Sequence, residues 1–302
     1  MIESYSLFKT QILLLCLIFV GVVTAKVRMI DEHARSSLND LILSVLLPCS
    51  ILSAFFDTDR SQLPSLGIIL TISLVVLAFS YILSNVFFRK AGPEQKKVFI
   101  YATLISNAAL LGTPVVESIY GPESLTYVAA YLLPLRVALW TFGIAVFTGG
   151  KGNIKKAVFH PCLIATYLGL LVMILGINAP ALVSKLVFSL GNCTTVFSMI
   201  VVGNILAQVN PKKILTRLTV YFTFIRLILI PLLVMGICFV ARLDPIITGI
   251  SVILSGMPAG VTTSMLAEKY NGDRELASSI IFVSTLLSII SAPLLAALVN
   301  KL

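Results

Sequence analysis

Two apolar stretches of the sequence are interrupted by proline, glycine and small polar residues, and these residues are the strongest candidates for chemistry. The stretches read Ser106-Asn-Ala-Ala-Leu-Leu-Gly-Thr-Pro-Val115 and Ser255-Gly-Met-Pro-Ala-Gly-Val-Thr-Thr-Ser264. Proline removes a backbone donor and clashes with the preceding turn, and glycine weakens a helix, so we expect each stretch to break near its proline. A helix that restarts there presents free N–H groups and a positive dipole end, which favour an anion such as a carboxylate. The predicted anion-binding residues are Asn107, Gly112, Thr113, Pro114, Pro258, Gly260, Thr262 and Thr263.

The same residues have a purely structural interpretation. Proline often kinks a membrane-spanning helix, and Gly256-Met-Pro-Ala-Gly260 also fits the GxxxG pattern by which such helices pack. One kink alone would favour packing. Two interrupted stretches at equivalent places in the two halves of the chain favour a binding site.

Two arginines fall near the middle of long apolar runs. Arg136 and Arg226 are costly in hydrocarbon, so we expect both to face the protein interior or water and to be paired. As countercharges they would suit an anionic substrate, and we include them among the substrate-binding candidates. The alternatives are a structural ion pair or a contact to the carbonyl groups of a broken helix.

The remaining candidates are less specific. Ser106, Glu117 and Glu268 could bind a coupling Na⁺ or exchange a coupling proton, although both glutamates lie near span ends, where solvation is common. Pro48 and the pair Asn192 and Thr194 occupy matching runs and could face substrate or only pack against a neighbouring helix. Neither metal-ligand nor nucleotide-binding spacing is present, so we expect no cofactor, no metal and no enzymatic activity.

Composition places these residues in a membrane. Of 302 residues, 58% are hydrophobic and 12% are charged, with a mean hydropathy of +1.03, whereas a soluble domain has roughly 25% charged residues. The net charge of +9 comes from basic residues in short gaps between apolar runs, as membrane topology produces, and this argues against a nucleic-acid partner. The five cysteines lie in or beside apolar runs and indicate neither disulfides nor a metal site.

The apolar runs predict an all-α integral membrane protein with ten transmembrane helices. The first run ends in Val23-Thr24-Ala25, which resembles a signal-peptide cleavage site, but the preceding segment carries Glu3 and a single basic residue, Lys9, so we interpret the run as a first transmembrane helix. The predicted spans are residues 8–26, 38–56, 64–88, 97–119, 124–148, 159–177, 182–208, 215–241, 245–268 and 276–299.

Charge and repetition predict the topology. The connections after the odd-numbered spans hold 15 Lys and Arg and the other side holds 5, which places both termini outside the cell membrane. A polar connection at 149–156 divides the chain into residues 1–150 and 151–302, with five spans each. Because five is odd, homologous halves would insert with opposite orientation, as an inverted repeat. The strings Tyr120-Gly-Pro-Glu-Ser-Leu125 and Tyr270-Asn-Gly-Asp-Arg-Glu-Leu276 follow the fourth span of each half and support this repeat.

The whole chain resembles the auxin efflux carrier family. The resemblance rests on the five-plus-five pattern, on Leu47-Pro48, on Asn107 to Pro114 followed by Tyr120-Gly-Pro-Glu, and on Pro258-Ala-Gly with Thr-Thr and Ala-Glu-Lys-Tyr270. The short central connection is similar to microbial members. Many relatives carry a proline where this chain has Thr194 to Ser198, and Arg136 does not match a family feature.

The resemblance implies a fold like that of the bile-acid/sodium symporters. Spans 1, 2, 6 and 7 would form a scaffold that often dimerises, and spans 3–5 and 8–10 a moving core in which broken helices 4 and 9 cross. The implied activity is secondary transport of a small organic anion by an elevator movement of the core, in a homodimer within the lipid bilayer. The alternatives from other classes are a membrane receptor or scaffold without transport, or a passive channel.

Overall fold

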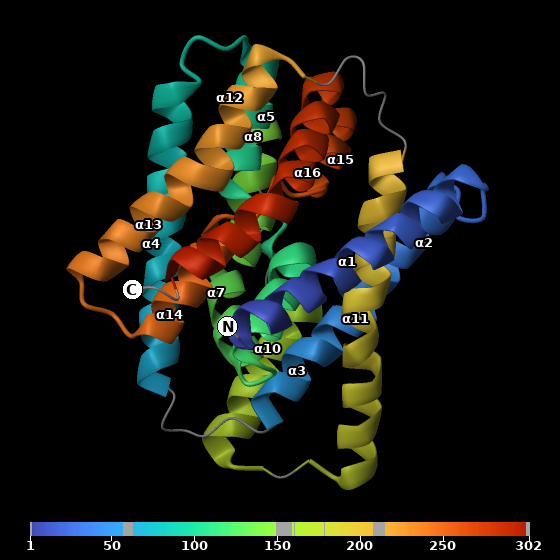
Figure 1. Ribbon diagram of the computed structural model, residues 1–302, viewed down its shortest axis with the longest axis vertical. Helices are drawn as coiled ribbons and strands as arrows, with labels where there is room; N and C mark the ends of the chain where they lie inside the picture. The colour runs from blue at the N-terminus through green and yellow to red at the C-terminus, as the bar shows by residue number, and fades with distance from the viewer. Residues whose placement is uncertain are drawn as a thin grey trace.

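The computed structural model describes residues 2–56, 63–148, 159, 161–177, 179–207 and 215–299, and within these ranges the chain is helical (Figure 1). The β-type pairing found there is an isolated bridge between Ser106 and Ala259. The described residues therefore confirm the predicted all-α class.

Each predicted span coincides with one helix or with a run of consecutive helices. In the first half these are α1 (Ile2–Lys26), α2 (Glu32–Leu41) with η1 (Ile42–Leu46) and α3 (Leu47–Phe56), α4 (Leu63–Phe87), α5 (Pro93–Leu104) with η3 (Ala108–Gly112) and α6 (Thr113–Tyr120), and α7 (Ser124–Ala138) with η4 (Leu139–Gly143) and α8 (Ile144–Thr148). In the second half they are α10 (Pro161–Leu175), α11 (Ala181–Ala207), α12 (Arg217–Phe224) with η6 (Ile225–Leu229) and α13 (Ile230–Val240), α14 (Pro245–Ser255) with α15 (Thr262–Lys269), and α16 (Arg274–Val299).

Six of the helical runs in the described residues are long and apolar enough to cross a membrane: Glu32–Ser53, Leu63–Phe87, Ser124–Thr148, Ala181–Val201, Arg217–Val240 and Arg274–Val299. Four shorter apolar helices accompany them: Cys16–Lys26, Ala108–Tyr120, Pro161–Leu175 and Pro245–Ser255. A multi-pass membrane protein is thus supported. The arrangement as ten spans in two inverted repeats stays a prediction.

The helices begin where the sequence supplies caps. The Asp31 carboxylate accepts from Ala34 N at 2.8 Å ahead of α2, and Asp244 accepts from Ile246 N at 2.8 Å ahead of α14. Thr216 and Thr219 exchange hydrogen bonds in a capping box at the start of α12. Each cap satisfies N–H groups that the first helical turn leaves without an intrahelical acceptor.

Three of the π-helical turns share one cause. Each of η1, η3 and η6 is followed by one residue and then by a proline, at Pro48, Pro114 and Pro231 respectively. A proline ring inside an α-helix clashes with the carbonyl group four residues earlier. The wider turn, in which the residue before the proline donates to the carbonyl five residues earlier, relieves that clash and lets the helix continue.

Glycine permits a close crossing of two helices. Helix α1 packs along α11, and Gly21 and Gly203 face each other there: a Cβ added to either would meet the backbone of the other helix, lying 2.9 Å from the opposite glycine Cα. Helix α3 packs against both α10 and α11, and a Cβ at Gly191 would lie 3.0 Å from Ser50 Cα. Small residues at these points allow the close backbone approach that membrane helices use.

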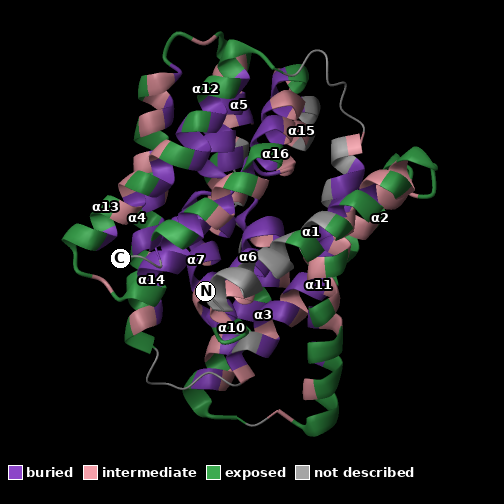
Figure 2. Ribbon diagram, in the orientation of Figure 1, coloured by how far each residue is buried: buried purple, intermediate pink, exposed green. Residues whose placement is uncertain are grey.

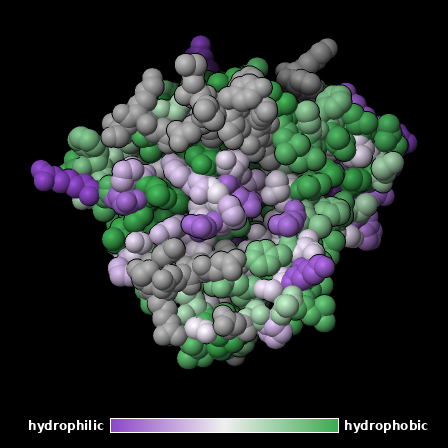
Figure 3. All heavy atoms as spheres, turned by 60° about the horizontal axis from the view of Figure 1, so that its bottom comes forward, coloured by the Kyte–Doolittle hydropathy of each residue, from purple (hydrophilic) through white to green (hydrophobic). Residues whose placement is uncertain are grey.

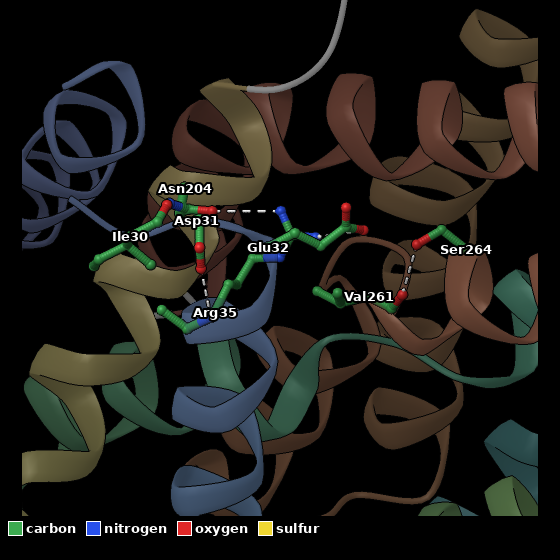
Figure 4. A network of polar contacts seen from close by, with 8 residues as sticks. Ile30, Asp31, Glu32, Arg35, Asn204, Val261 and Ser264 are labelled. Carbon is green, nitrogen blue, oxygen red and sulfur yellow. Dashed lines mark hydrogen bonds and ion pairs between the residues drawn. The ribbon is translucent and has the colours of Figure 1, made fainter. Parts of the chain in front are cut away.

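The connection after α1 is tied to α11 by partly buried polar contacts (Figure 4). Asn204 of α11 donates through Nδ2 to Ile30 O at 2.8 Å, and Arg35 of α2 donates to Asn204 Oδ1 at 3.4 Å. Figure 4 also shows Ser264 of α15 donating to Val261 O, at 3.1 Å. The two bonds of Asn204 fix the α1–α2 connection against the end of α11.

Buried residues gather in the middle of the molecule, along α5, α6, α7 and α14, while the outer faces of α4, α11 and α13 are exposed (Figure 2). Much of the exposed area is hydrophobic, and in Figure 3 hydrophilic residues gather toward the middle of the face. A surface of this kind suits hydrocarbon on its outward faces. Examples of its exposed residues are Leu74, Ile82, Leu171, Leu186, Phe239 and Leu294.

Candidate functional site

The two interrupted stretches meet and bond to each other in the middle of the molecule. Residues 105–107, between α5 and η3, run antiparallel to residues 258–260, between α14 and α15. Asn107 N donates to Pro258 O at 2.8 Å, and Gly260 N donates to Ile105 O at 3.0 Å. The polar backbone that each break exposes is thus partly satisfied by the other break, as non-helical backbone at membrane depth requires.

Glycine permits this approach. A Cβ at Gly260 would lie 3.0 Å from Ile105 O, and a Cβ at Gly112 would lie 2.8 Å from Leu254 Cδ2 and 2.9 Å from Met257 Cγ. At Gly260 the obstacle is backbone, so a larger residue would push the two broken runs apart, whereas at Gly112 the side chains of Leu254 and Met257 would have to move. Both glycines were chosen from the sequence as part of the site, and the structure places both where the two runs touch.

The first break does not lie at its proline. The sequence predicted that the helix would restart after Pro114, but it restarts at Ala108, and Pro114 is the second residue of α6 inside the renewed helix. The π-helical turn η3 accommodates the ring, so no break is needed there. Pro258, in contrast, does lie in its break, between Gly256 and Gly260.

Arg226 binds the carboxyl ends of both broken runs. It is 2% exposed, and it donates through Nε to Met257 O and through Nη1 to Thr103 O, at 2.9 Å each. Thr103 lies in the last turn of α5, and Met257 lies two residues beyond α14. Of the roles weighed for Arg226, contact to the carbonyl groups of a broken helix is the one found, and its positive charge offsets the negative ends of two helix dipoles.

The amino ends of the renewed helices carry donors that nothing in the described residues uses. Ser106 Oγ, Asn107 Nδ2 and Thr263 Oγ1 are buried without a hydrogen-bond partner there. Thr262 Oγ1 instead accepts from Tyr101 OH at 2.8 Å. Buried polar groups are normally hydrogen-bonded, so an unused cluster beside two positive helix ends indicates a place for an acceptor.

Arg136 lies elsewhere, in the last turn of α7. It is 7% exposed, and its Nη1 and Nη2 have no hydrogen-bond partner among the described residues. It lines a small cavity together with residues of α3 and with Thr113. The expected pairing of this arginine is therefore not found among the described residues.

The remaining candidates are more dispersed. Thr194 is buried in α11 with Oγ1 unpartnered among the described residues, and α11 packs against η3. Pro48 and Glu117 are half-buried, and Asn192 is exposed. The side chain of Glu268 lies outside the described residues. One residue that the sequence did not single out, Ser284 of α16, donates to Ile280 O and accepts from Ala259 N at 3.2 Å, which fixes the second break. The sequence signal that could have identified this residue is a serine within an otherwise apolar helix.

Comparison with known proteins decides the family. The membrane transport protein family matches residues 6–156 and 150–296, which is nearly the whole chain. The chain belongs to this family. It is the family of auxin efflux carriers whose motifs the sequence resembles, and short microbial proteins are among the relatives.

Three relatives align with this chain over almost the full length of both proteins. An "Uncharacterized transporter" of Methanothermobacter thermautotrophicus is 26% identical over 95% of this chain and 96% of its own. A "Putative malonate transporter" of Rhizobium meliloti is 24% identical over 90% and 89%. The "Uncharacterized transporter YfdV" of Escherichia coli is 20% identical over 93% and 94%. Together with the six long apolar helices, membership of this family indicates a multi-pass membrane transporter.

Proposed function

We propose that this family member is a secondary active carrier of a small organic anion, a carboxylate, which binds where the two broken runs cross. The observation that carries the proposal is the unequal treatment of the helix ends. The two carboxyl ends at the crossing are bound by Arg226, whereas the two amino ends face buried donors to which no described residue bonds. An anion is the ligand that this arrangement lacks.

Charge arithmetic supports an anion. Each helix end carries about half an elementary charge, negative at the carboxyl end and positive at the amino end. The guanidinium of Arg226 offsets the two negative ends, so the two amino ends leave about one positive charge uncompensated. The relative named for malonate, a carboxylate, is in keeping with this sign.

We propose an elevator-type movement between two groups of helices. Helices α1, α3, α10 and α11 pack on one another, and α4 packs on α5 and α7, as α12 packs on α16 and α13 on α14. The pairings repeat after a shift of five spans: α1 with α11 corresponds to α10 with α3, and α4 with α7 to α12 with α16. This repetition supports inverted repeats at 1–150 and 151–302. We propose in addition that the first group is a scaffold that forms a homodimer, with both termini outside.

Transport by exchange is the deciding experiment. Purified protein in proteoliposomes loaded with unlabelled malonate should take up labelled malonate by saturable counterflow. Malate and indole-3-acetate are then tested as competitors of this uptake. Linear uptake without competition would indicate a passive channel, and the absence of any flux for all three carboxylates would indicate a receptor or scaffold.

Asn107 gives the first prediction at the level of one residue. Its buried Nδ2 is free to donate to the anion, and loss of a hydrogen bond to a charged group costs about 1.5–3 kcal/mol, or roughly ten-fold to a hundred-fold in affinity. Asn107→Ala should therefore raise the KM of counterflow by that factor while the protein stays folded, because no described residue accepts a hydrogen bond from Nδ2. Asn85→Ala on α4, where Nδ2 donates to Tyr81 O of the same helix, is the control outside the proposed site. An unchanged KM for Asn107→Ala would remove the crossing as the binding site.

The second prediction concerns the coupling ion. Carbonyl groups at the ends of broken helices often bind Na⁺ in secondary transporters, but Thr103 O and Met257 O already accept from Arg226. We propose that the guanidinium takes the place of such an ion, which leaves a proton, with Glu117 or Glu268 as its carrier, as the coupling ion. Counterflow should have the same rate when Na⁺ is replaced by choline on both sides. A requirement for Na⁺ would contradict this assignment and would point to Ser106 and its neighbours.

A further inference from the structure

A second buried arginine, Arg136, has no hydrogen-bond or ion-pair partner in the part of the chain that the structure describes. Arg136 of α7 is 7% exposed, yet neither Nη1 nor Nη2 meets an acceptor among the described residues, and no carboxylate there lies within ion-pair distance. A guanidinium is always charged and offers five donors in a planar fork. Arg226, which is equally buried, shows the contrast, because two carbonyl groups accept from it. An unpaired charge inside a membrane protein marks a functional position by default.

The guanidinium adjoins a cavity of about 10 Å³. A space of this size holds about one water molecule. Three of the lining residues are polar, and they come from three different helices: Arg136 from α7, Ser50 from α3 and Thr113 from α6. The rest of the lining is apolar: Leu47, Ile51, Leu125, Val128, Ala129 and Leu132. One fork of donors and two hydroxyl groups in an apolar wall suit a small oxyanion.

The cavity lies close to the crossing. Thr113 belongs to the same continuous helix as Ala108, where that helix begins, and lies one π-helical turn further on, with Thr113 N donating to Ala108 O. The Thr113 hydroxyl donates to Ala108 O at 3.4 Å, and it would give up this long bond to donate its single hydrogen to a carboxylate. A short molecule that binds the amino end of η3 through one carboxylate could therefore reach Arg136 with a second.

We propose that Arg136, Ser50 and Thr113 form a second anion subsite, which binds the second carboxylate of a short dicarboxylate and so sets the substrate specificity. This inference rests on the proposed function. Arg136 would hold the carboxylate bidentately, a geometry that guanidinium and carboxylate share.

The position of the subsite links binding to movement. It lies between α3 of the proposed scaffold and α6 and α7 of the proposed core. A carboxylate is larger than one water molecule, so these helices must separate slightly to admit it. A dicarboxylate would then bind best in the conformation in which the core has moved away from α3.

Thermal stability of the purified protein tests the subsite without transport. Binding to the folded state raises the melting temperature by mass action, so titration with malonate or succinate, and separately with acetate or propionate, gives the two affinities. We expect Arg136→Gln to weaken malonate or succinate binding roughly ten-fold to a hundred-fold, the loss typical of a charged hydrogen bond, and to leave acetate or propionate binding unchanged. Lys185→Gln, which removes an exposed charge from α11, is the control.

Each result separates this inference from the proposed function. If no carboxylate stabilises the unaltered protein, the proposed function falls. If malonate or succinate binds Arg136→Gln as tightly as the unaltered protein, the subsite falls and the crossing site stands. Sulfate and chloride form the third arm: protection by either that requires Arg136 and does not compete with the dicarboxylate would assign the cavity to a free inorganic anion and would overturn the specificity role.

The stability of the empty protein distinguishes a structural role. Because Arg136 has no partner in the described residues, Arg136→Gln should melt at or above the temperature of the unaltered protein. A large drop in the melting temperature without ligand would show that Arg136 holds the fold together, and would overturn the subsite. Arg136→Lys keeps the charge but not the fork, and should recover part of the dicarboxylate affinity.

Discussion

Replacing Arg226 by glutamine is expected to destabilise the protein severely and to abolish transport. In the folded protein Thr103 O and Met257 O are buried and accept from this one side chain. A buried acceptor that loses its donor costs about 1–3 kcal/mol, so the two together cost about 2–6 kcal/mol. The carboxyl ends of α5 and α14 would also face each other without a compensating charge, which weakens the crossing electrostatically.

Arg136→Gln is the matched control, because it removes an equally buried arginine that has no partner in the described residues. The melting temperature of the purified protein should fall clearly for Arg226→Gln and not for Arg136→Gln. Arg226→Lys should be intermediate, since an ammonium group has one centre where the guanidinium bonds through two separate nitrogen atoms. Equal melting temperatures for the two glutamine variants would mean that the bonds of Arg226 do not hold the crossing together.

The contrast between the two arginines also shows what sequence can and cannot predict. Both lie in apolar runs, and sequence alone predicted that both face the protein interior or water and are paired. The partners of Arg226 are backbone carbonyl groups, which leave no trace in residue identity, so its role could only be given as one alternative. Arg136 lacks a partner altogether in the described residues, and no pattern in the sequence distinguishes it from Arg226.

The breaks illustrate the same limit. Glycine, proline and asparagine correctly indicated where two apolar runs would be interrupted, because these residues weaken a helix whatever surrounds them. They did not give the position of the first break. The π-helical turn η3 accommodates Pro114, and the helix is interrupted at residues 105–107 instead. That position depends on Gly260 and Pro258, which bond to it from the other half of the chain. Contacts between residues so far apart in the sequence depend on how the helices pack, which local residue patterns do not give.

Gly203→Val is expected to separate α1 from α11 and to lower the stability of the protein as strongly as any single packing change. A side chain at Gly203 would meet Ile18 O and would lie 2.9 Å from Gly21 Cα. Overpacking costs about 1–3 kcal/mol and occasionally more, and here the obstacle is backbone, which cannot rotate away as a flexible side chain does. Gly203→Ala should also lower the stability, but by less than Gly203→Val, because its single methyl group already meets that backbone.

Gly67→Ala and Gly236→Ala give the opposite sign and serve as controls. Both glycines lie inside helices, α4 and α13, and a Cβ at either would have nothing within 4 Å. Alanine favours a helix by about 0.5–1 kcal/mol over glycine, so these variants should melt at or above the temperature of the unaltered protein. If Gly203→Ala were as stable as Gly67→Ala, the two helices could not be in backbone contact, and the proposed scaffold would lose the crossing on which its rigidity depends.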